Sequence, residues 1–219
     1  MTDSEIKNSI IDIGRRLHDG GYVASNDGNI SVRGGDGGIW MTPTGVSKGD
    51  MTPDMLIKVD LDGRMLEGNR RPSTESAMHL RLYKENKNIM AAVHAHPTAA
   101  TSFAIAGIPL DRPIYPEAAV NLGTVPVAPY AQPGTQEVPD SIAPFCHSHV
   151  AVLLGFHGAL TWGANLTEAW YRMEALENYA KITLNVCYLM RSDAVLTREQ
   201  LERCTGGLTP ADRLNGRIG

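Results

Sequence analysis

The hydrophobic positions along the chain follow two repeating patterns. Near the N-terminus, Ile6, Ile10, Ile13 and Leu17 recur every three or four residues, which predicts an amphipathic helix that starts near residue 4 and ends before Gly20. Further along, short apolar runs separated by glycine, proline and aspartate are typical of strands joined by turns. We expect a first strand that begins at residue 30. Further strands are expected over 39–41, 56–60, 64–67, 89–96, 124–128 and 150–154.

Longer stretches between the predicted strands have the spacing of helices. We expect helices over 73–85, 97–106, from about 135 to 146, over 166–190 and over 197–204. Short strands that alternate with helices predict an α/β fold in which helices cover at least one face of a sheet. Since no internal repeat or linker interrupts the pattern, we expect a single domain spanning 1–219, with a loose C-terminal tail from about residue 205.

Composition and charge narrow the class of protein. The net charge of -4 and the lack of a concentrated Lys/Arg stripe argue against a nucleic-acid or anionic-membrane partner. No segment approaches the roughly 18 to 20 apolar residues of a membrane span, and the acidic first residues do not resemble a secretory signal. The three cysteines are odd in number and widely spaced, which fits a reducing compartment. We therefore expect a cytoplasmic protein.

The candidate chemistry starts with two histidines near the end of a predicted strand. His94 and His96 are two positions apart, so in a strand their imidazoles share one face. His157 follows another apolar run and lies between glycines. With Glu75, these residues form a ligand set that suits Zn²⁺ or another divalent transition metal such as Mn²⁺, Co²⁺ or Ni²⁺. Because no cysteine contributes, a catalytic metal is favoured over a structural one.

Glu75 and its neighbours also have simpler interpretations. Acids are common in the first turn of a helix because they interact favourably with the helix dipole, so Glu75 alone does not indicate a ligand. His79, four residues later, would lie on the same helix face as Glu75. It could be a hydrogen-bond partner of Glu75 or a surface histidine, and we expect a surface histidine.

Two polar turns could bind an anion. Thr44 and Gly45 follow one predicted strand, while Ser73 and Thr74 precede a predicted helix, whose first amides can bind phosphate. The glycines at 34–38 do not follow the spacing of known phosphate-binding loops, and we interpret them as a hairpin turn.

Six short segments occur in the order and spacing of one family. These segments are Gly28–Ser31, Thr42–Gly45, Pro72–Glu75, His94–His96, Ala128–Thr135 and His157–Leu160. Over roughly residues 5 to 190 the chain resembles the class II aldolase/adducin family, and most closely its L-fuculose-1-phosphate aldolase branch. The resemblance implies a three-layer α/β/α sandwich with a largely antiparallel central sheet, assembled as a C4 homotetramer with active sites between subunits.

The resemblance also implies roles for individual residues. His94, His96 and His157 match residues that hold zinc, and Glu75 matches a ligand that becomes the base once substrate displaces it. The positions that match phosphate-binding residues are Asn29, Thr44, Gly45, Ser73 and Thr74. Tyr115 matches a tyrosine that a neighbouring subunit supplies as a proton donor, although packing among prolines is the alternative interpretation of the residue itself.

The function implied is the reversible cleavage of a ketose 1-phosphate to dihydroxyacetone phosphate and an aldehyde. L-Fuculose 1-phosphate and 5-deoxy- or 5-methylthioribulose 1-phosphate are the expected substrate types. Two departures from the fuculose enzyme point to a different aldehyde: residues 211–219 contain no tyrosine, and Glu117 places a charge in a segment that is apolar in that enzyme.

Three alternatives remain at this point. The first is a 3-oxo-tetronate 4-phosphate-type decarboxylase, which uses the same enolate chemistry. The second is an L-ribulose-5-phosphate 4-epimerase, which would need an acid at the position of Ala119. The third is a non-catalytic interaction module like the adducin head, and the presence of all four candidate ligands argues against it.

Overall fold

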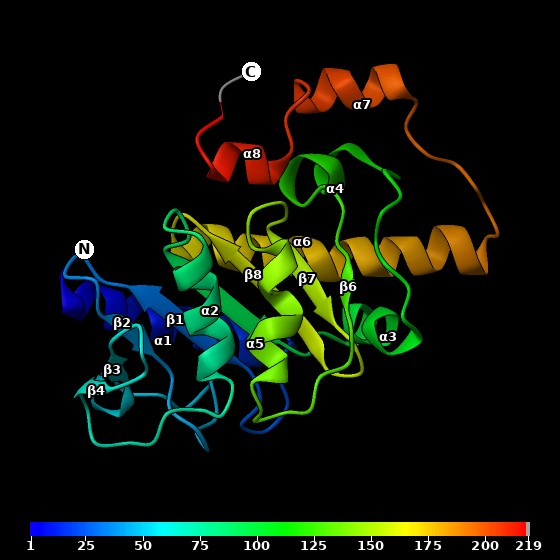
Figure 1. Cartoon of the computed structure of the whole chain (residues 1–219). Coiled ribbons are helices and arrows are strands. Elements are labelled where there is room, and N and C mark those ends of the chain that lie inside the picture. The colour runs from blue at the N-terminus through cyan, green and yellow to red at the C-terminus, as the bar shows by residue number, and fades with distance from the viewer. Residues whose placement is uncertain (218–219) are drawn as a thin grey trace.

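A mixed sheet of eight strands organises the computed structural model, which describes residues 1–217 (Figure 1). The strands lie in the order β4-β3-β2-β1-β5-β8-β7-β6. Their bounds are Asn29–Arg33 (β1), Ile39–Met41 (β2), Ile57–Val59 (β3), Met65–Glu67 (β4), Ala91–Ala95 (β5), Val127–Ala128 (β6), Ala151–Leu154 (β7) and Gly158–Gly163 (β8). Among the described strands, only β6 and β7 pair in parallel, so the predicted antiparallel character is confirmed.

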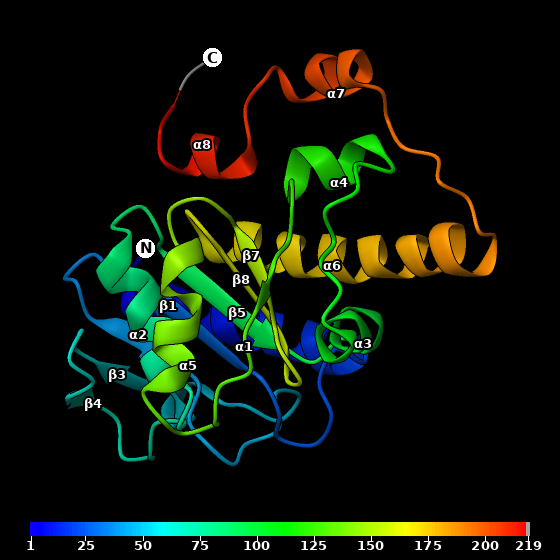
Figure 2. The ribbon, with the colours of Figure 1, turned by 45° about the vertical axis from the view of Figure 1, so that its right-hand side comes forward.

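Helices cover both faces of this sheet. Their bounds are Asp3–Asp19 (α1), Ser76–Glu85 (α2), Thr98–Ala106 (α3), Pro116–Asn121 (α4), Glu137–Ile142 (α5), Leu166–Thr183 (α6), Arg198–Thr205 (α7) and Pro210–Leu214 (α8), with 3-10 turns η1 (Pro53–Met55) and η2 (Ala143–Phe145) and a π-helical segment η3 (Leu184–Leu189). Helices α2 and α5 lie on one face, and α1, α3 and α6 on the other (Figures 1 and 2). The three-layer α/β/α sandwich is therefore confirmed.

The central strand β5 has a core on each side. Because successive side chains of a strand point to opposite faces, Val93 packs with Ile10 and the helices of one layer, while Ala92 packs with Met78 and Leu82 of the other. All five residues of β5 are buried, as expected for a strand covered by helices on both faces. Each large aliphatic side chain buried in this way contributes about 1.5–3 kcal/mol. The predicted site residue His94 is thus carried by a strand that is packed on both faces.

The first helix begins and ends as its sequence indicates. The Thr2 hydroxyl accepts a hydrogen bond from the Glu5 amide, and the Glu5 carboxylate accepts one from the Thr2 amide. This reciprocal capping satisfies two donors that the start of a helix leaves free. Gly20 ends the helix, as predicted.

Strand β8 and helix α4 are among the elements that the apolar pattern did not predict. Strand β8 was missed because glycines stand at both its ends and every residue is buried, so no alternation of apolar and polar positions marks it. Helix α4 was missed because it has only six residues and starts at Pro116, within a stretch rich in proline.

The tail from about residue 205 was expected to be loose, but α8 lies within it. Pro210 and Ala211 are buried, and the Arg213 guanidinium donates to the Val120 carbonyl. The Asn215 amide nitrogen donates to the carbonyl of His147, and its oxygen accepts from Asn86. These contacts order a segment whose own sequence has little apolar periodicity.

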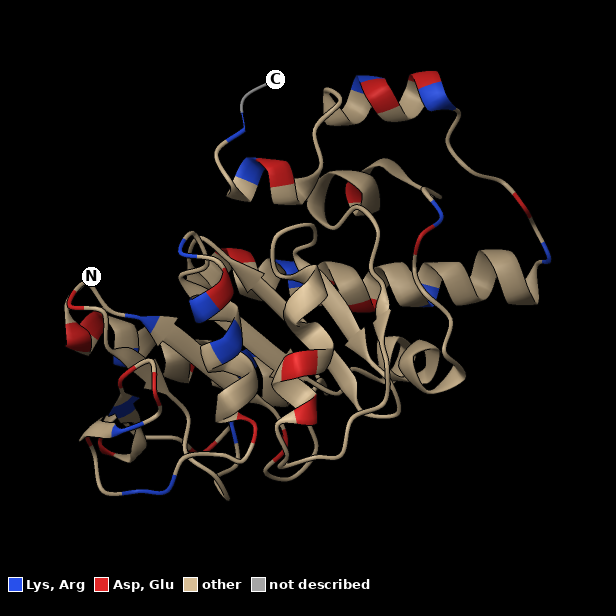
Figure 3. Ribbon diagram, in the orientation of Figure 1, with Lys and Arg blue, Asp and Glu red and all other residues tan. Residues whose placement is uncertain are grey.

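Charged residues are spread over the whole molecule. Figure 3 shows basic and acidic residues interspersed on the helices and loops, with no stripe of a single sign. Within residues 1–217, none of the helices combines the length and the apolar character that a bilayer span requires.

Candidate metal centre

Three histidines that are distant in the sequence meet at one edge of the sheet. His94 lies in β5, His96 directly follows that strand, and His157 lies in the turn between β7 and β8. Because β8 pairs with β5, this turn comes next to the end of β5. Candidate ligand nitrogens of the three rings all lie within 4.8 Å of one another. The sequence-predicted histidine set is thus brought together in the structure.

The rings are oriented so that their Nε2 atoms face each other. The Nε2 atoms of His94 and His96 are 3.1 Å apart. On the far side of the His94 ring, Nδ1 donates to the Ala159 carbonyl at 2.9 Å, and Nδ1 of His96 lies 3.4 Å from an Asp27 carboxylate oxygen. A histidine whose Nδ1 is held in this way presents the Nε2 lone pair to a metal. The donor set therefore fits a divalent transition metal.

The protonation states of His96 and Glu75 agree with this orientation. Burial, together with the neighbouring His94 and His157, lowers the pKa of His96 to about 4. Burial works against ionisation of Glu75, but the charge of His94 and hydrogen bonds from His157, His94 and Asn29 outweigh it, so the pKa of this carboxyl is held well below its usual range. The site thus holds a neutral imidazole and a carboxylate, both able to donate electron pairs.

Glu75 faces the histidines from helix α2. Its Oε1 atom lies 3.0 Å from Nε2 of His157 and 3.4 Å from Nε2 of His94, while Asn29 donates to Oε2 at 2.7 Å. The helix starts at Ser76, so Glu75 is the N-cap residue and not, as predicted, part of the first turn. The reason is local: the Ser73 hydroxyl accepts from the Glu75 amide and forms a separate turn before the helix.

A buried polar network lies behind Asn29. His79 was expected at the surface, but it is only 1% exposed, because α2 turns this residue toward the sheet. Its Nε2 donates to Asn29 Oδ1 at 2.9 Å, and its Nδ1 accepts from the Ser31 hydroxyl, which in turn accepts from Tyr83. Burial lowers the pKa of His79 to about 3, so the imidazole is neutral, as this tautomer requires. The network fixes the amide of Asn29 beside Glu75.

A cavity of about 170 Å³ opens beside the Glu75 carboxylate. Its lining residues are Asn26, Asp27, Gly28, Asn29, Pro43, Thr44, Gly45, Ser73, Glu75, His96 and His157. Four of the five predicted phosphate-binding residues are in this set, and Thr74 is not. In the described chain, the amides of Gly45 and Val46 have no hydrogen-bond acceptor, so they are available to an anion.

Two lining residues escaped the sequence interpretation. Asn26 and Asp27 directly precede the segment from Gly28 to Ser31 that carries part of the resemblance, and only this proximity could have indicated them. In the structure Asp27 lies beside His96, so it is placed to orient that ring.

Two glycines allow the chain to approach the histidines. Gly28 has a left-handed backbone (φ 75°), and a Cβ there would lie 2.8 Å from the His94 carbonyl. A Cβ on Gly158 would lie 2.5 Å from a ring carbon of His96. Side chains at these positions would displace the ligand pair.

Tyr115 is not among the residues that line this cavity. It precedes α4, where its hydroxyl accepts from Asn178 at 3.4 Å and its ring contacts the ring of Tyr179 edge-on. The structure of one chain therefore does not bring Tyr115 together with the other predicted site residues.

Comparison with known proteins identifies the family. A model of the Class II Aldolase and Adducin N-terminal domain matches residues 8–184. The chain belongs to the class II aldolase and adducin family. Class II aldolases depend on divalent metals, which agrees with the three converging histidines.

Two curated relatives have different activities in their names. The 3-oxo-tetronate 4-phosphate decarboxylase of Escherichia coli K12 is 37% identical over 166 residues, which cover 74% of this chain and 78% of the relative. The L-fuculose phosphate aldolase of Methanocaldococcus jannaschii is 31% identical over 178 residues, covering 81% of this chain and 95% of the relative.

Solved structures of class II aldolases have the same fold. An L-fuculose 1-phosphate aldolase superposes with a TM-score of 0.87 at 32% sequence identity, covering 94% of this chain and 97% of that chain. The fold thus agrees with the family assignment over nearly the whole chain.

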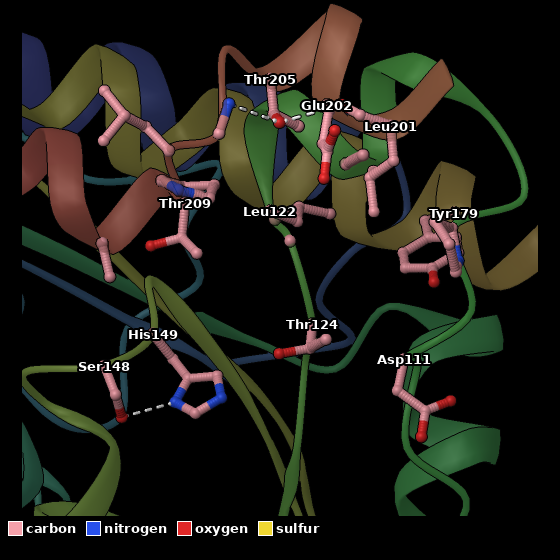
Figure 4. Close-up of a pocket in the computed structure, with 17 residues that line it drawn as sticks. Asp111, Leu122, Thr124, Ser148, His149, Tyr179, Leu201, Glu202, Thr205 and Thr209 are labelled. Carbon is pink, nitrogen blue, oxygen red and sulfur yellow. Dashed lines mark hydrogen bonds between the residues drawn. The ribbon is translucent and has the colours of Figure 1, made fainter. Parts of the chain in front are cut away.

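A larger cavity of about 440 Å³ lies elsewhere in this class II aldolase family member (Figure 4). Side chains of α4, α6, α7 and α8 line it, among them Ala119, Tyr179 and Leu201. His149, hydrogen-bonded to Ser148, also lines it. None of the predicted site residues does. The smaller cavity is the candidate site because the converging imidazoles and the carboxylate open into it.

Proposed function

We propose that this protein is a divalent-metal-dependent lyase that reversibly cleaves a ketose 1-phosphate to dihydroxyacetone phosphate and an aldehyde. The observation that carries the proposal is the position of the Glu75 carboxylate, which faces three converging imidazoles and lines a cavity suited to phosphate. L-Fuculose 1-phosphate and 5-deoxy- or 5-methylthioribulose 1-phosphate are the candidate substrates.

The proposed metal is zinc, with Mn²⁺, Co²⁺ or Ni²⁺ as alternatives. His94, His96 and His157 would hold it, together with Glu75 in the absence of substrate. When bound, the metal supplies electrophilic stabilisation of the negative charge that develops on the substrate oxygens. The Nδ1 contacts of His94 and His96 support this assignment because they turn both Nε2 atoms toward one point, where these atoms are 3.1 Å apart.

Glu75 is the proposed base. In the direction of synthesis, its carboxylate takes a proton from the carbon that carries the hydroxyl of dihydroxyacetone phosphate. The electron pair of that C–H bond stays on the substrate as an enediolate, which then forms the new carbon–carbon bond to the aldehyde. In the cleavage direction, protonated Glu75 returns the proton to the same carbon. The hydrogen bond from Asn29 to Oε2 orients the carboxylate for both steps.

The proposed phosphate-binding residues are Asn29, Thr44, Gly45, Ser73 and Thr74. Four of them line the cavity, where hydroxyls and the free amide of Gly45 supply donors. Helix α2 begins at Ser76, two residues after Thr74, so the partial positive charge of its N-terminus adds to these donors.

Tyr115 would act from a neighbouring subunit of a C4 homotetramer. Its hydroxyl would give a proton to the aldehyde oxygen as the carbon–carbon bond forms and take it back during cleavage. Its place outside the cavity of its own chain supports an intersubunit role.

Decarboxylation of a 3-oxo-tetronate 4-phosphate is the second candidate, favoured by the 37% identity to such an enzyme. Loss of CO₂ from that substrate leaves the same enediolate, so Glu75 would serve both reactions.

We also propose that the enzyme acts in the cytoplasm. Cys146, Cys187 and Cys204 are free thiols, which agrees with a reducing compartment.

The first experiment is proton exchange. Metal-loaded enzyme in D₂O should replace a C–H proton of dihydroxyacetone phosphate with deuterium, which NMR detects without any aldehyde. Absence of exchange with Zn²⁺, Mn²⁺, Co²⁺ and Ni²⁺ would overturn the proposal. Product analysis with ketose 1-phosphates and with 3-oxo-tetronate 4-phosphate then decides whether an aldehyde or CO₂ leaves.

A further inference from the structure

Lys48 has an environment that is unusual for a lysine. The residue is only 1% exposed, and its Nζ donates to the carbonyl of Asn26 at 3.1 Å and to the carbonyl of Val46 at 2.8 Å. Lysines are almost never fully buried unless their charge has partners. Burying this ammonium costs free energy, so a role in the site would explain its position.

The two carbonyls belong to different turns of the candidate site. Asn26 starts the turn 26–28, and Val46 ends the turn 44–46, and residues of both turns line the 170 Å³ cavity. The Lys48 ammonium therefore links two segments of the cavity wall that are separate in the sequence. The backbone of Lys48 is itself fixed, because its carbonyl packs so closely on Gly14 of α1 that a Cβ there would approach it to 2.8 Å.

The carboxylates around the cavity are without a cationic side chain among the described residues that line it. Asp27 and Glu75 contribute carboxylates to its walls, and no lysine or arginine of the described chain lines it. A phosphate would add further negative charge. Burial lowers the pKa of Lys48 to about 8, while Asp27 and Glu75 favour its charged form. Since Asp27 and Glu75 act on the pKa of this ammonium, its charge acts in turn on the walls of the cavity, and in a protein interior such charges are weakly screened.

We propose that Lys48 is a positioning residue that holds turns 26–28 and 44–46 together and supplies the fixed positive charge for the substrate's phosphate. This inference rests on the proposed function, in which the cavity receives a phosphate group. Lys48 touches the turns and not the substrate, so its effect is on the geometry and potential of the pocket.

The test compares Lys48→Met with Lys84→Met, which removes an exposed lysine paired with Asp62. Calorimetry measures binding of inorganic phosphate to the metal-loaded enzymes, and steady-state kinetics measures KM and kcat for the ketose 1-phosphate. For Lys48→Met we expect the phosphate Kd and the KM to rise by about 10- to 100-fold, the range for losing hydrogen bonds to a charged group. We expect kcat to change by less than about threefold and the metal content to stay the same. Lys84→Met should match the wild type in every measurement.

The outcomes separate this inference from the proposed function. Equal phosphate affinity in wild type and Lys48→Met would overturn the role of Lys48 and leave the proposed function intact. A wild-type enzyme that binds no phosphate, with a KM insensitive to Ser73→Ala, would contradict the phosphate site itself. If Lys48→Met does not fold, Lys48→Gln keeps N–H donors without the charge: weaker phosphate binding at unchanged metal content supports the inference, and unchanged binding overturns it.

Discussion

The Nε2 atom of His157 lies 3.0 Å from the Oε1 atom of Glu75. The histidine comes from the turn between β7 and β8, and the glutamate from the start of α2. The same carboxylate is held from its other side by Asn29 of β1. Three separate elements of the fold therefore fix one carboxylate against the candidate metal ligands, and the consequences can be tested residue by residue.

Replacing Glu75 with glutamine should remove the base and keep the metal site. We expect deuterium exchange into dihydroxyacetone phosphate to fall by about 10²- to 10⁴-fold, because an amide cannot accept the proton. Metal content, measured by atomic absorption, should persist on the three histidines. Glu85→Gln, at the far end of the same helix, is the matched control. Unchanged exchange in Glu75→Gln would remove this residue as the base.

Removing the metal should abolish exchange without unfolding the chain. Dialysis against a chelator is expected to eliminate activity, and added Zn²⁺, Mn²⁺, Co²⁺ or Ni²⁺ to restore it. His157→Ala should bind metal at least 10-fold more weakly because one of three imidazoles is lost. The control is His147→Ala, since His147 is exposed and outside the cluster. Full activity of the chelated protein would exclude a metal role.

Loss of His79 should affect both stability and the site. His79→Leu leaves the amide oxygen of Asn29 and the hydroxyl of Ser31 without their buried partner, which costs about 1–3 kcal/mol in the free energy of unfolding. Urea denaturation measures this cost. Activity should fall as well, because Asn29 is then free to turn away from Glu75. A fully stable and active variant would show that the network has no such role.

The buried Lys48 should make stability depend on alkaline pH. Its pKa is about 8 in the folded chain and about 10.4 in an unfolded one. Between these values the unfolded state binds more protons, so the free energy of unfolding rises with pH. From pH 7.5 to 10, the wild type should gain about 2 kcal/mol relative to Lys48→Met, which has no proton to lose there. Parallel pH profiles in chemical denaturation would contradict the lowered pKa.

The intersubunit role of Tyr115 can be tested by mixing variants. Glu75→Gln and Tyr115→Phe should each be nearly inactive alone. If a site combines Glu75 of one subunit with Tyr115 of its neighbour, subunits reassembled from an equal mixture should recover about one quarter of the wild-type activity. Recovery should require dissociation and reassembly, and a mixture that stays inactive after reassembly would place both residues in one subunit.

The sequence predicted the α/β/α layers and the candidate metal ligands. It did not predict the residues that hold these candidate ligands in position. Apolar periodicity is strong in α1, and a continuous apolar run before the two histidines marks β5, so both elements were located. His94 and His96 were found together because their spacing of two is itself the signal of a shared strand face. His157 has no partner at such a spacing, so the residues around it could not show that it lies beside His94 and His96. Its place depends on the pairing of β8 with β5, and β8 has no alternation to reveal it.

The missed residues are those whose role depends on tertiary contacts. His79 looks like any polar residue of a helix, and only the packing of α2 on the sheet shows that it is buried. Lys48 lies in an unremarkable polar turn, and its ammonium gains its meaning from the carbonyls of Asn26 and Val46. α8 is held by contacts such as that of Asn215 with Asn86, which no pattern within the tail encodes.

The register between β1 and β5 places Asn29 directly opposite His94. A shift of one residue in either strand would turn the side chain to the other face of the sheet. A gene that gained or lost a single codon within β1 would thus encode a strand whose apolar side chains point to the wrong faces and whose Asn29 amide no longer reaches Glu75. Evolution toward new substrates is therefore expected to proceed by substitution, and not by insertion or deletion of residues within β1 or β5.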